Sequence, residues 1–351
     1  MTTPSRAARV HGCLVGGAVG DALGWPVEFL RWPEIRARYG AGGIAGFDER
    51  APGGRGAVTD DTQMTLFTAE GLLRASAGAS GTDFLADVPG AVRRAYLRWL
   101  RTQGATCDDA EAWRAARDED APDGLLGMRA LHAVRAPGAT CLAALRAGGT
   151  GTRTRPINDS KGCGGVMRVA PVALHGGVPD DAVFALAATV AALTHGHPSG
   201  WLSAGAHAEI LRRLVRGATL DAALDGAMAR LAREPAHDET SRALAAARAL
   251  AATGAAPSPA GVGTLGGGWV GEEALAIAVY AALVGRDDVP RALRVAVNHS
   301  GDSDSTGSIA GQLLGARLGI DAVPAAWREG VELADVLAQT ADALVAEWAG
   351  G

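Results

Sequence analysis

The feature that most constrains this chain is a succession of helical segments whose apolar positions are filled mainly by Ala, Leu and Val. Hydrophobic residues make up 48% of the 351 residues, whereas aromatic residues make up only 5%. A core of small aliphatic side chains favours closely packed helices, and no segment shows the alternation of a half-buried strand. We therefore predict an all-α fold, a single compact orthogonal multi-helical domain over residues 1–351, with its functional site between helix N-termini and loops.

Apolar residues at helical spacing cover most of the sequence. Thr62–Ala77 shows the clearest amphipathic pattern, and the Gly- and Ala-rich Arg6–Leu23 implies close backbone contacts rather than a free surface helix. Gly-rich loops at Gly40–Gly56, Gly148–Ser160 and Gly254–Gly268 interrupt the pattern. The other predicted helices are Thr82–Arg101, Ala110–Arg117, Gly124–Arg135, Asp180–Leu193, Ser199–Arg216, Leu220–Arg233, Glu239–Thr253, Glu272–Val284, Val289–Val297, Ser305–Leu318 and Val331–Ala349.

Composition excludes several classes of partner. A net charge of -5 leaves no basic footprint for nucleic-acid binding. The sequence has no apolar run of the signal-peptide kind and no uninterrupted stretch of membrane-spanning length. The four cysteines lack C-x-x-C spacing, which fits reduced thiols: Cys13, Cys107, Cys141 and Cys163. We expect a cytoplasmic monomer without a membrane anchor.

An acidic and hydroxyl-rich segment runs from Asn298 to Gly311. Asp302 and Asp304 alternate with serine and threonine at the start of a helical apolar pattern. Such hard oxygen donors suit Mg²⁺, Mn²⁺ or Ca²⁺, although a solvated, capped helix start would use the same residue types. A calcium EF-hand loop is excluded because Leu313 stands where the bidentate Glu is needed.

A second acidic cluster precedes the Thr62–Ala77 helix. Asp60 and Asp61 lie side by side at its start, which is more than capping requires. If this cluster meets Asp302 and Asp304 in space, four carboxylates converge, and their repulsion is costly unless cations neutralise it. Two divalent ions a few ångströms apart would do so.

Six motifs in order resemble those of the ADP-ribosylglycohydrolases, a family that includes the dinitrogenase reductase-activating glycohydrolases. Each motif alone is a weak signal, but six in the right order over nearly the whole chain are a strong one. The motifs lie at Gly12–Glu28, Val58–Thr62, Gly162–Pro171, Thr194–Pro198, Gly266–Leu275 and Gly301–Gly307.

This resemblance implies a hydrolase that cleaves the N- or O-glycosidic bond at C1″ of the distal ribose of ADP-ribose. Its favoured activity is reversal of protein mono-ADP-ribosylation, such as on arginine, with a small molecule or nucleic acid as other acceptors. The resemblance implies two Mg²⁺ or Mn²⁺ ions on Thr59, Asp60, Asp61, Asp302, Asp304 and Ser305. It also implies that Glu28, or a metal-bound aspartate such as Asp60 or Asp304, handles the proton of the attacking water.

The Gly-rich turn within Ile157–Arg168 can offer backbone N–H groups to a phosphate, although the residues alone favour a tight helix-entry turn. The resemblance implies that Ser160, Lys161, Gly162 and Gly164 cradle the diphosphate of ADP-ribose. Members of the family often have Asn where this chain has Cys163. The resemblance further implies that His195 contacts the ribose or phosphate, whereas helix capping is its ordinary role.

Three further residues receive structural roles. Trp269 follows three glycines, and we expect it to anchor that loop rather than to wall the site. Asp21 lies in a Gly/Ala helix end, where capping or packing suits it. Glu272 opens a helix and is well placed for the helix dipole.

Two other functions fit parts of the pattern. A non-catalytic ADP-ribose-binding protein would have lost at least one metal carboxylate, but both acidic pairs are present here. A dinuclear-metal nucleotide phosphohydrolase would need the same metals but would release phosphate instead of free ADP-ribose.

Overall fold

A computed structural model describes residues 3–78, 84–118 and 124–348. Helices account for all the regular structure in these ranges, and the one β pairing among them is an isolated bridge between Gly162 and Val270. The predicted all-α class is therefore confirmed. The buried apolar side chains form one cluster that runs from Val10 to Leu344.

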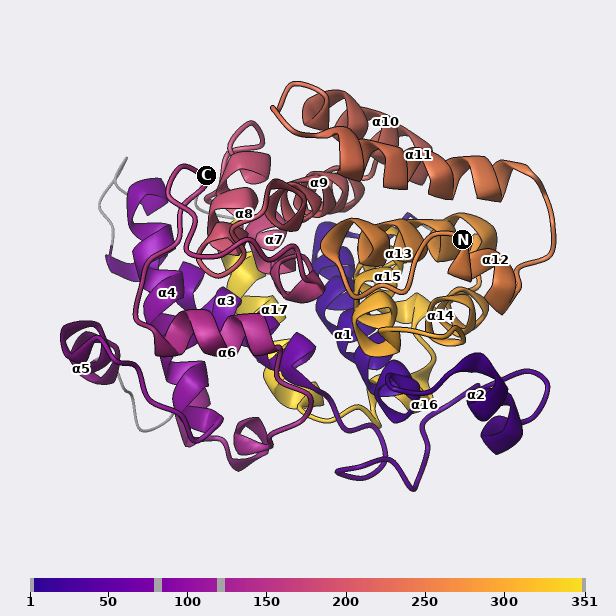
Figure 1. Cartoon of the computed structure of the whole chain (residues 1–351), viewed down its shortest axis with the longest axis horizontal. Helices are drawn as coiled ribbons and strands as arrows, with labels where there is room; N and C mark the ends of the chain where they lie inside the picture. The colour runs from indigo at the N-terminus through magenta and orange to yellow at the C-terminus, as the bar shows by residue number, and fades with distance from the viewer. Residues whose placement is uncertain (1–2, 79–83, 119–123, 349–351) are drawn as a thin grey trace.

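The centre of the molecule is an antiparallel pair of helices, α1 (Arg6–Gly24) and α15 (Ser303–Leu318), which lie side by side in Figure 1. Their backbones touch because glycines face each other at four-residue steps. A Cβ on Gly16 would lie 2.5 Å from the carbonyl oxygen of Gly311, so no larger residue fits. The facing pairs are Gly12 with Gly315, Gly16 with Gly311 and Gly20 with Gly307.

This pairing places two segments that carry predicted site residues beside each other. Because the helices are antiparallel, the end of α1 lies at the beginning of α15, where a Cβ on Gly24 would lie 2.2 Å from the carbonyl oxygen of Ser303. A short 3₁₀ helix, η1 (Trp25–Val27), then carries the chain to Glu28. The close backbone contact predicted for the Gly/Ala-rich first helix is thus confirmed.

Helix α3 (Asp60–Gly78) is fixed to α1 by a side-chain cap. The Asp21 carboxylate accepts hydrogen bonds from the backbone N–H of Thr59 at 3.0 Å and from that of Thr62 at 3.1 Å. The hydroxyls of both threonines also donate to it. Asp21 therefore supplies the N-terminal cap of α3 from another helix, in line with its expected capping role, and holds the second acidic cluster against α1.

The remaining helices surround this centre. In Figure 1, α10 and α11 lie along the top edge, and α4 and α5 lie at the left. The bounds are α2 (Trp32–Tyr39), α4 (Phe84–Thr102), α5 (Ala110–Asp118), η3 (Leu125–Gly127), η4 (Arg129–His132), α6 (Ala139–Arg146), η5 (Cys163–Gly165), α7 (Ala170–Leu174), α8 (Val183–Ala192), α9 (Pro198–Val215), α10 (Leu220–Leu231), α11 (Asp238–Ala252), α12 (Pro259–Gly263), α13 (Gly271–Gly285), α14 (Val289–Val297), η6 (Ile320–Ala322), α16 (Ala325–Arg328) and α17 (Ala334–Ala346).

Most predicted helices are found within a few residues of their expected bounds, but Gly124–Arg135 is wrong. That segment forms the two 3₁₀ turns η3 and η4, separated by an extended Met128, so the α-helical hydrogen-bond ladder never propagates. The short helices α2, α7 and α12 were not predicted because each carries Pro in its first turn, a favourable position that resembles a loop signal.

Parts of two predicted helices cannot be compared, because Thr82, Asp83 and Ala349 lie outside the described residues. Among the helices that are described, none is by itself long and apolar enough to cross a membrane. Residues Arg6–Val27 and Trp32–Tyr39 pass that test only as a pair bent by 95°, on length and composition alone.

We predict that Gly311→Ala destabilises the fold by about 1–3 kcal/mol, the usual cost of overpacking. Its Cβ would lie 1.9 Å from the carbonyl oxygen of Gly16, so α1 and α15 must move apart. Urea denaturation measures the change. The matched control is Gly263→Ala in α12, whose Cβ would meet no atom within 4 Å. Equal stability of the two variants would contradict the glycine contact.

Candidate active site

A pocket of about 420 Å³ opens at the end of α1 and the starts of α3 and α15. Both acidic clusters contribute to its wall, together with the Gly-rich loop before η5 and a loop that precedes α6. The lining residues are Glu28, Phe29, Asp60, Asp61, Ala136, Pro137, Gly138, Ala139, Thr140, Cys141, Gly162, Cys163, Gly164, Met167, His195, Trp269, Asp302, Asp304 and Ser305.

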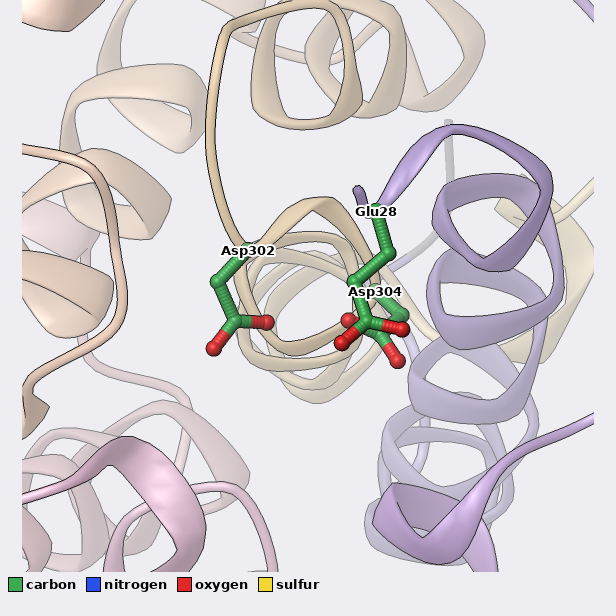
Figure 2. A group of neighbouring side chains, drawn as sticks. All are labelled: Glu28, Asp302 and Asp304. Carbon is green, nitrogen blue, oxygen red and sulfur yellow. The ribbon is translucent and has the colours of Figure 1, made fainter. Parts of the chain in front are cut away.

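The carboxylates converge as the sequence predicted. One oxygen from each of Glu28, Asp302 and Asp304 lies within 4.8 Å of the other two, and Figure 2 shows Glu28 pointing from the end of α1 toward the start of α15. The hydroxyl of Ser305 donates to Asp61 Oδ2 at 3.3 Å and so joins the two acidic clusters. Segments far apart in the chain thereby form one acidic site.

Burial and mutual repulsion disfavour the charged forms of these acids. Burial, followed by repulsion from Asp304, raises the pKa of Glu28 to about 11. The same causes raise the pKa of Asp61 well above its usual value, and burial is the largest cause for Asp60, Asp302 and Asp304. A cluster of this kind is unstable when ionised unless cations enter it.

The donor set fits a divalent cation. Glu28 Oε2 and Asp61 Oδ1 are buried and have no hydrogen-bond partner. No Lys, Arg or His forms an ion pair with the five acids in the described part of the chain. Buried, unpaired carboxylate oxygens are the ligands that hard cations prefer.

Thr59 lies behind the pocket wall. Its hydroxyl donates to Asp21 at 3.0 Å and accepts the N–H of Asp61 at 3.3 Å. Burial is the largest of the effects that raise the pKa of Asp21 to about 7, followed by Asp304. The predicted role of Thr59 as a metal ligand stays a prediction, whereas its contacts show how it orients Asp61.

The Gly-rich loop is held against the segment before α13. Cys163 N–H donates to the carbonyl of Trp269 at 3.1 Å, and Gly271 N–H donates to that of Lys161 at 2.8 Å. A Cβ on Gly164 would lie 2.9 Å from Cys141 Sγ and 3.1 Å from the ring of His195. Glycine at this position therefore keeps the pocket open between the loop and His195.

Lys161 and Ser160 do not belong to the pocket lining. Lys161 Nζ forms ion pairs with Glu239 at 2.9 Å and Glu272 at 2.6 Å. Ser160 Oγ lies 2.9 Å from the hydroxyl of Thr140. Their substrate contacts stay predictions, but Lys161 here fixes the loop to α11 and α13. Glu272 accordingly does more than complement a helix dipole, because it is the buried partner of this lysine.

His195 is buried at the pocket wall, where its ring faces Gly162 and Gly164. Burial and then the nearby Arg168 lower its pKa to about 3, so the ring is neutral at physiological pH. Thr194 Oγ1 accepts a hydrogen bond from Arg168 and lies 2.9 Å from His195 Nδ1. The Thr194 hydroxyl can donate a hydrogen bond to Nδ1, and in the neutral ring the proton then lies on Nε2, which becomes a donor toward the pocket.

The expectation for Trp269 is wrong. Its side chain is 46% exposed at the pocket mouth, where it stacks on Phe29 with 5.9 Å between ring centroids. The loop is anchored by Glu273 instead, which accepts the N–H groups of Gly267 and Gly268. A glycine-rich loop tied by a carboxylate leaves its aromatic side chain free to face the site.

Sequence reasoning also missed the loop before α6. Gly138 N–H donates to Asp60 Oδ2 at 3.0 Å, and Ala136, at φ 45°, turns the backbone toward the pocket. The Pro137–Gly138 pair is a turn signal that could have marked this loop, but nothing local in the sequence links it to Asp60. Phe29, next to Glu28, was likewise not singled out.

The fold and the site define a class of protein, an all-α chain with a pocket of buried carboxylates and a glycine-lined wall. The comparisons then give the family. The model of the family described as ADP-ribosylglycohydrolase matches residues 2–351. The chain belongs to the ADP-ribosylglycohydrolase family and is an enzyme that removes ADP-ribose from a substrate.

Two relatives cover nearly the whole chain. This chain is 28% identical over 338 residues to the ADP-ribosyl-[dinitrogen reductase] glycohydrolase of Rhodospirillum rubrum, and the match covers 93% of this chain and 91% of the relative. A solved structure described as an ADP-ribosylglycohydrolase-related protein complex is 27% identical, with a TM-score of 0.67 over 98% of this chain and 99% of its own.

We predict that, in the presence of a chelator, the free energy of unfolding falls by at least about 1–2 kcal/mol as the pH rises from about 7 to 9. Burial raises the pKa of Glu28 and of the site aspartates in the folded state, so the folded chain binds more protons than the unfolded chain. The stability that these acids contribute at low pH is therefore lost as the pH rises toward and through their pKa values in the folded state. Thermal denaturation in chelator measures this loss.

Added Mg²⁺ or Mn²⁺ should raise the melting temperature, and most strongly at the upper end of this range, because a ligand of the native state stabilises it. Comparing the melting temperatures with cation and with chelator at the same pH cancels the contribution of titrating groups outside the pocket. A melting temperature that ignores both chelator and cation would count against a cation-filled cluster.

Proposed function

We propose that this enzyme is a metal-dependent hydrolase that cleaves the N- or O-glycosidic bond at C1″ of the distal ribose and releases free ADP-ribose. Its favoured substrate is a mono-ADP-ribosylated protein, with arginine as the acceptor. The observation that carries the proposal is the convergence of Glu28, Asp302 and Asp304 with the Asp60–Asp61 cluster in one buried pocket. The Rhodospirillum rubrum relative is named for a protein substrate, which supports a protein acceptor here.

The residues that would hold two divalent cations, Mg²⁺ or Mn²⁺, are Thr59, Asp60, Asp61, Asp302, Asp304 and Ser305. Their hard oxygen donors and the unpartnered Asp61 Oδ1 support this assignment. When bound, such cations supply Lewis acidity and lower the pKa of water.

Glu28 is the best-placed group to move a proton. Its Oε2 atom has no hydrogen-bond partner, and the side chain lies on the pocket wall beside Asp304. We assign it, in the ionised form that bound cations would favour, to take the proton from the attacking water and to return it to the leaving group. Asp60 and Asp304 are the alternative carriers of that proton.

The opposite wall would bind the ADP-ribose moiety. His195 Nε2 faces the space that Gly162 and Gly164 leave free, where it can donate to a phosphate or ribose oxygen. Lys161 acts on this wall indirectly, because its ion pairs with Glu239 and Glu272 hold the loop in place.

The pocket mouth supports arginine as the acceptor. Phe29 and Trp269 stack there with an interplanar angle of 22°, and both rings are exposed. A planar guanidinium packs well on such aromatic faces, whereas a serine hydroxyl gains nothing from them.

Product analysis tests this function directly. The enzyme is incubated with Mn²⁺ and with ADP-ribosylated arginine, serine and nucleic-acid substrates, and mass spectrometry identifies what is released. We expect free ADP-ribose, with the arginine substrate turned over fastest. Release of phosphate or a nucleoside monophosphate would instead indicate a phosphohydrolase, and binding without release would indicate a non-catalytic ADP-ribose-binding protein.

We predict that Glu28→Gln lowers single-turnover hydrolysis by about 10²–10⁴-fold, the usual contribution of a general base. The amide keeps the shape of the side chain but cannot take a proton, so ADP-ribose binding by calorimetry should stay near wild type. The control is Glu329→Gln, an exposed carboxylate outside the pocket. Near wild-type hydrolysis by Glu28→Gln would refute the base role and move it to an aspartate of the site.

A further inference from the structure

Cys163 places a sulfur atom among the oxygen donors of the pocket. Its Sγ donates to Asp302 Oδ2 at 2.8 Å, and Ser305 Oγ lies 3.5 Å from the same sulfur. Both partners are residues that we assign to the cations. The thiol lies in the pocket lining and is only partly buried, so an ion that enters the pocket can reach it.

An unfilled donor atom lies in the lining of the same pocket as this sulfur. Asp61 is 2% exposed, and its Oδ1 has no hydrogen-bond partner. Its other oxygen accepts a hydrogen bond from the Ser305 hydroxyl at 3.3 Å. The oxygen of that hydroxyl also contacts the Cys163 sulfur. A buried, unpartnered carboxylate oxygen near a thiol marks a site with capacity for a ligand, and its charge requires that ligand to be a cation.

The second thiol of the pocket has the opposite surroundings. Cys141 Sγ accepts a hydrogen bond from the Arg168 guanidinium at 3.0 Å, and Arg168 is fully buried. A fixed positive charge at this distance repels a cation. Cys163 is therefore the pocket thiol with an anionic environment, and Cys141 provides a matched internal control.

Carboxylate and hydroxyl oxygens suit Mg²⁺ and Mn²⁺, whereas a thiolate strongly favours Zn²⁺ and Cd²⁺. We propose that Cys163 makes this pocket a site for a thiophilic divalent cation, held by the sulfur together with Asp302 and Asp61, which competes with the hard cations and so inhibits the enzyme. The inference rests on the proposed hard-cation site.

Coordination requires no oxidant or reductant. The S–H bond of Cys163 breaks, the proton leaves to solvent, and a sulfur lone pair forms the bond to the cation. The hydrogen bond from sulfur to Asp302 is lost, and both atoms instead contact the same positive charge. Zinc would thereby occupy part of the space in which the hard cations bind.

The test is a titration of the chelator-treated, dialysed enzyme with Cd²⁺ alone, followed by the ultraviolet thiolate-to-cadmium charge-transfer absorption. We expect absorption that saturates at one equivalent in the wild type. It should be absent in Cys163→Ser and retained in Cys141→Ser. Serine keeps a hydroxyl to donate to Asp302, and circular dichroism with Mn²⁺ calorimetry establishes that the variant is folded and binds a hard cation.

A competition measurement gives the magnitude. Cys163→Ser should weaken Cd²⁺ binding by about tenfold or more, since even outer-shell groups contribute about 10–100-fold to metal affinity. The Mn²⁺ affinity should stay nearly unchanged, because the serine hydroxyl can still donate to Asp302. Wild-type enzyme that binds Mn²⁺ but shows no charge-transfer absorption would overturn this inference alone. Equal absorption in Cys163→Ser would overturn it as well. Failure of the wild type to bind either cation would contradict the hard-cation site itself.

Discussion

The backbone contact between α1 and α15 is the constraint on which the rest of this enzyme depends. Facing glycines bring the helices so close that a Cβ at Gly20 would lie 1.9 Å from the carbonyl oxygen of Gly307. Because the helices are antiparallel, this contact sets the end of one against the start of the other. Glu28 and the Asp302–Asp304 cluster therefore meet through main-chain packing, which is far stiffer than a contact between long side chains.

The Asp21 carboxylate fixes the second cluster to α1. Asp21, on α1, caps α3 and so positions Asp60 and Asp61 against the same pocket. The fold thus gathers buried acids that repel each other, which disfavours the folded state by itself. A bound cation would relieve this repulsion, and the oxygens of Glu28 and Asp61 that have no hydrogen-bond partner are suited to contact it.

Local patterns in the sequence predicted much of this arrangement. Helical periodicity revealed the all-α class, and paired carboxylates at two helix starts revealed the acidic site. What could not be predicted depends on distant partners. Trp269 faces the pocket because Glu273 ties its loop, and Lys161 turns away because Glu239 and Glu272 hold it. Neither the sequence around Trp269 nor that around Lys161 specifies such tertiary contacts.

The central claim is that two acidic clusters, distant in sequence, form one cation site. Calorimetric titration of Mn²⁺ into the wild type, Asp61→Asn and Asp304→Asn tests it most directly, because each substitution removes one negative charge from a different cluster and keeps the side-chain shape. We predict that both variants lose at least one binding event of the wild type. Wild-type stoichiometry and affinity in either variant would contradict a shared site.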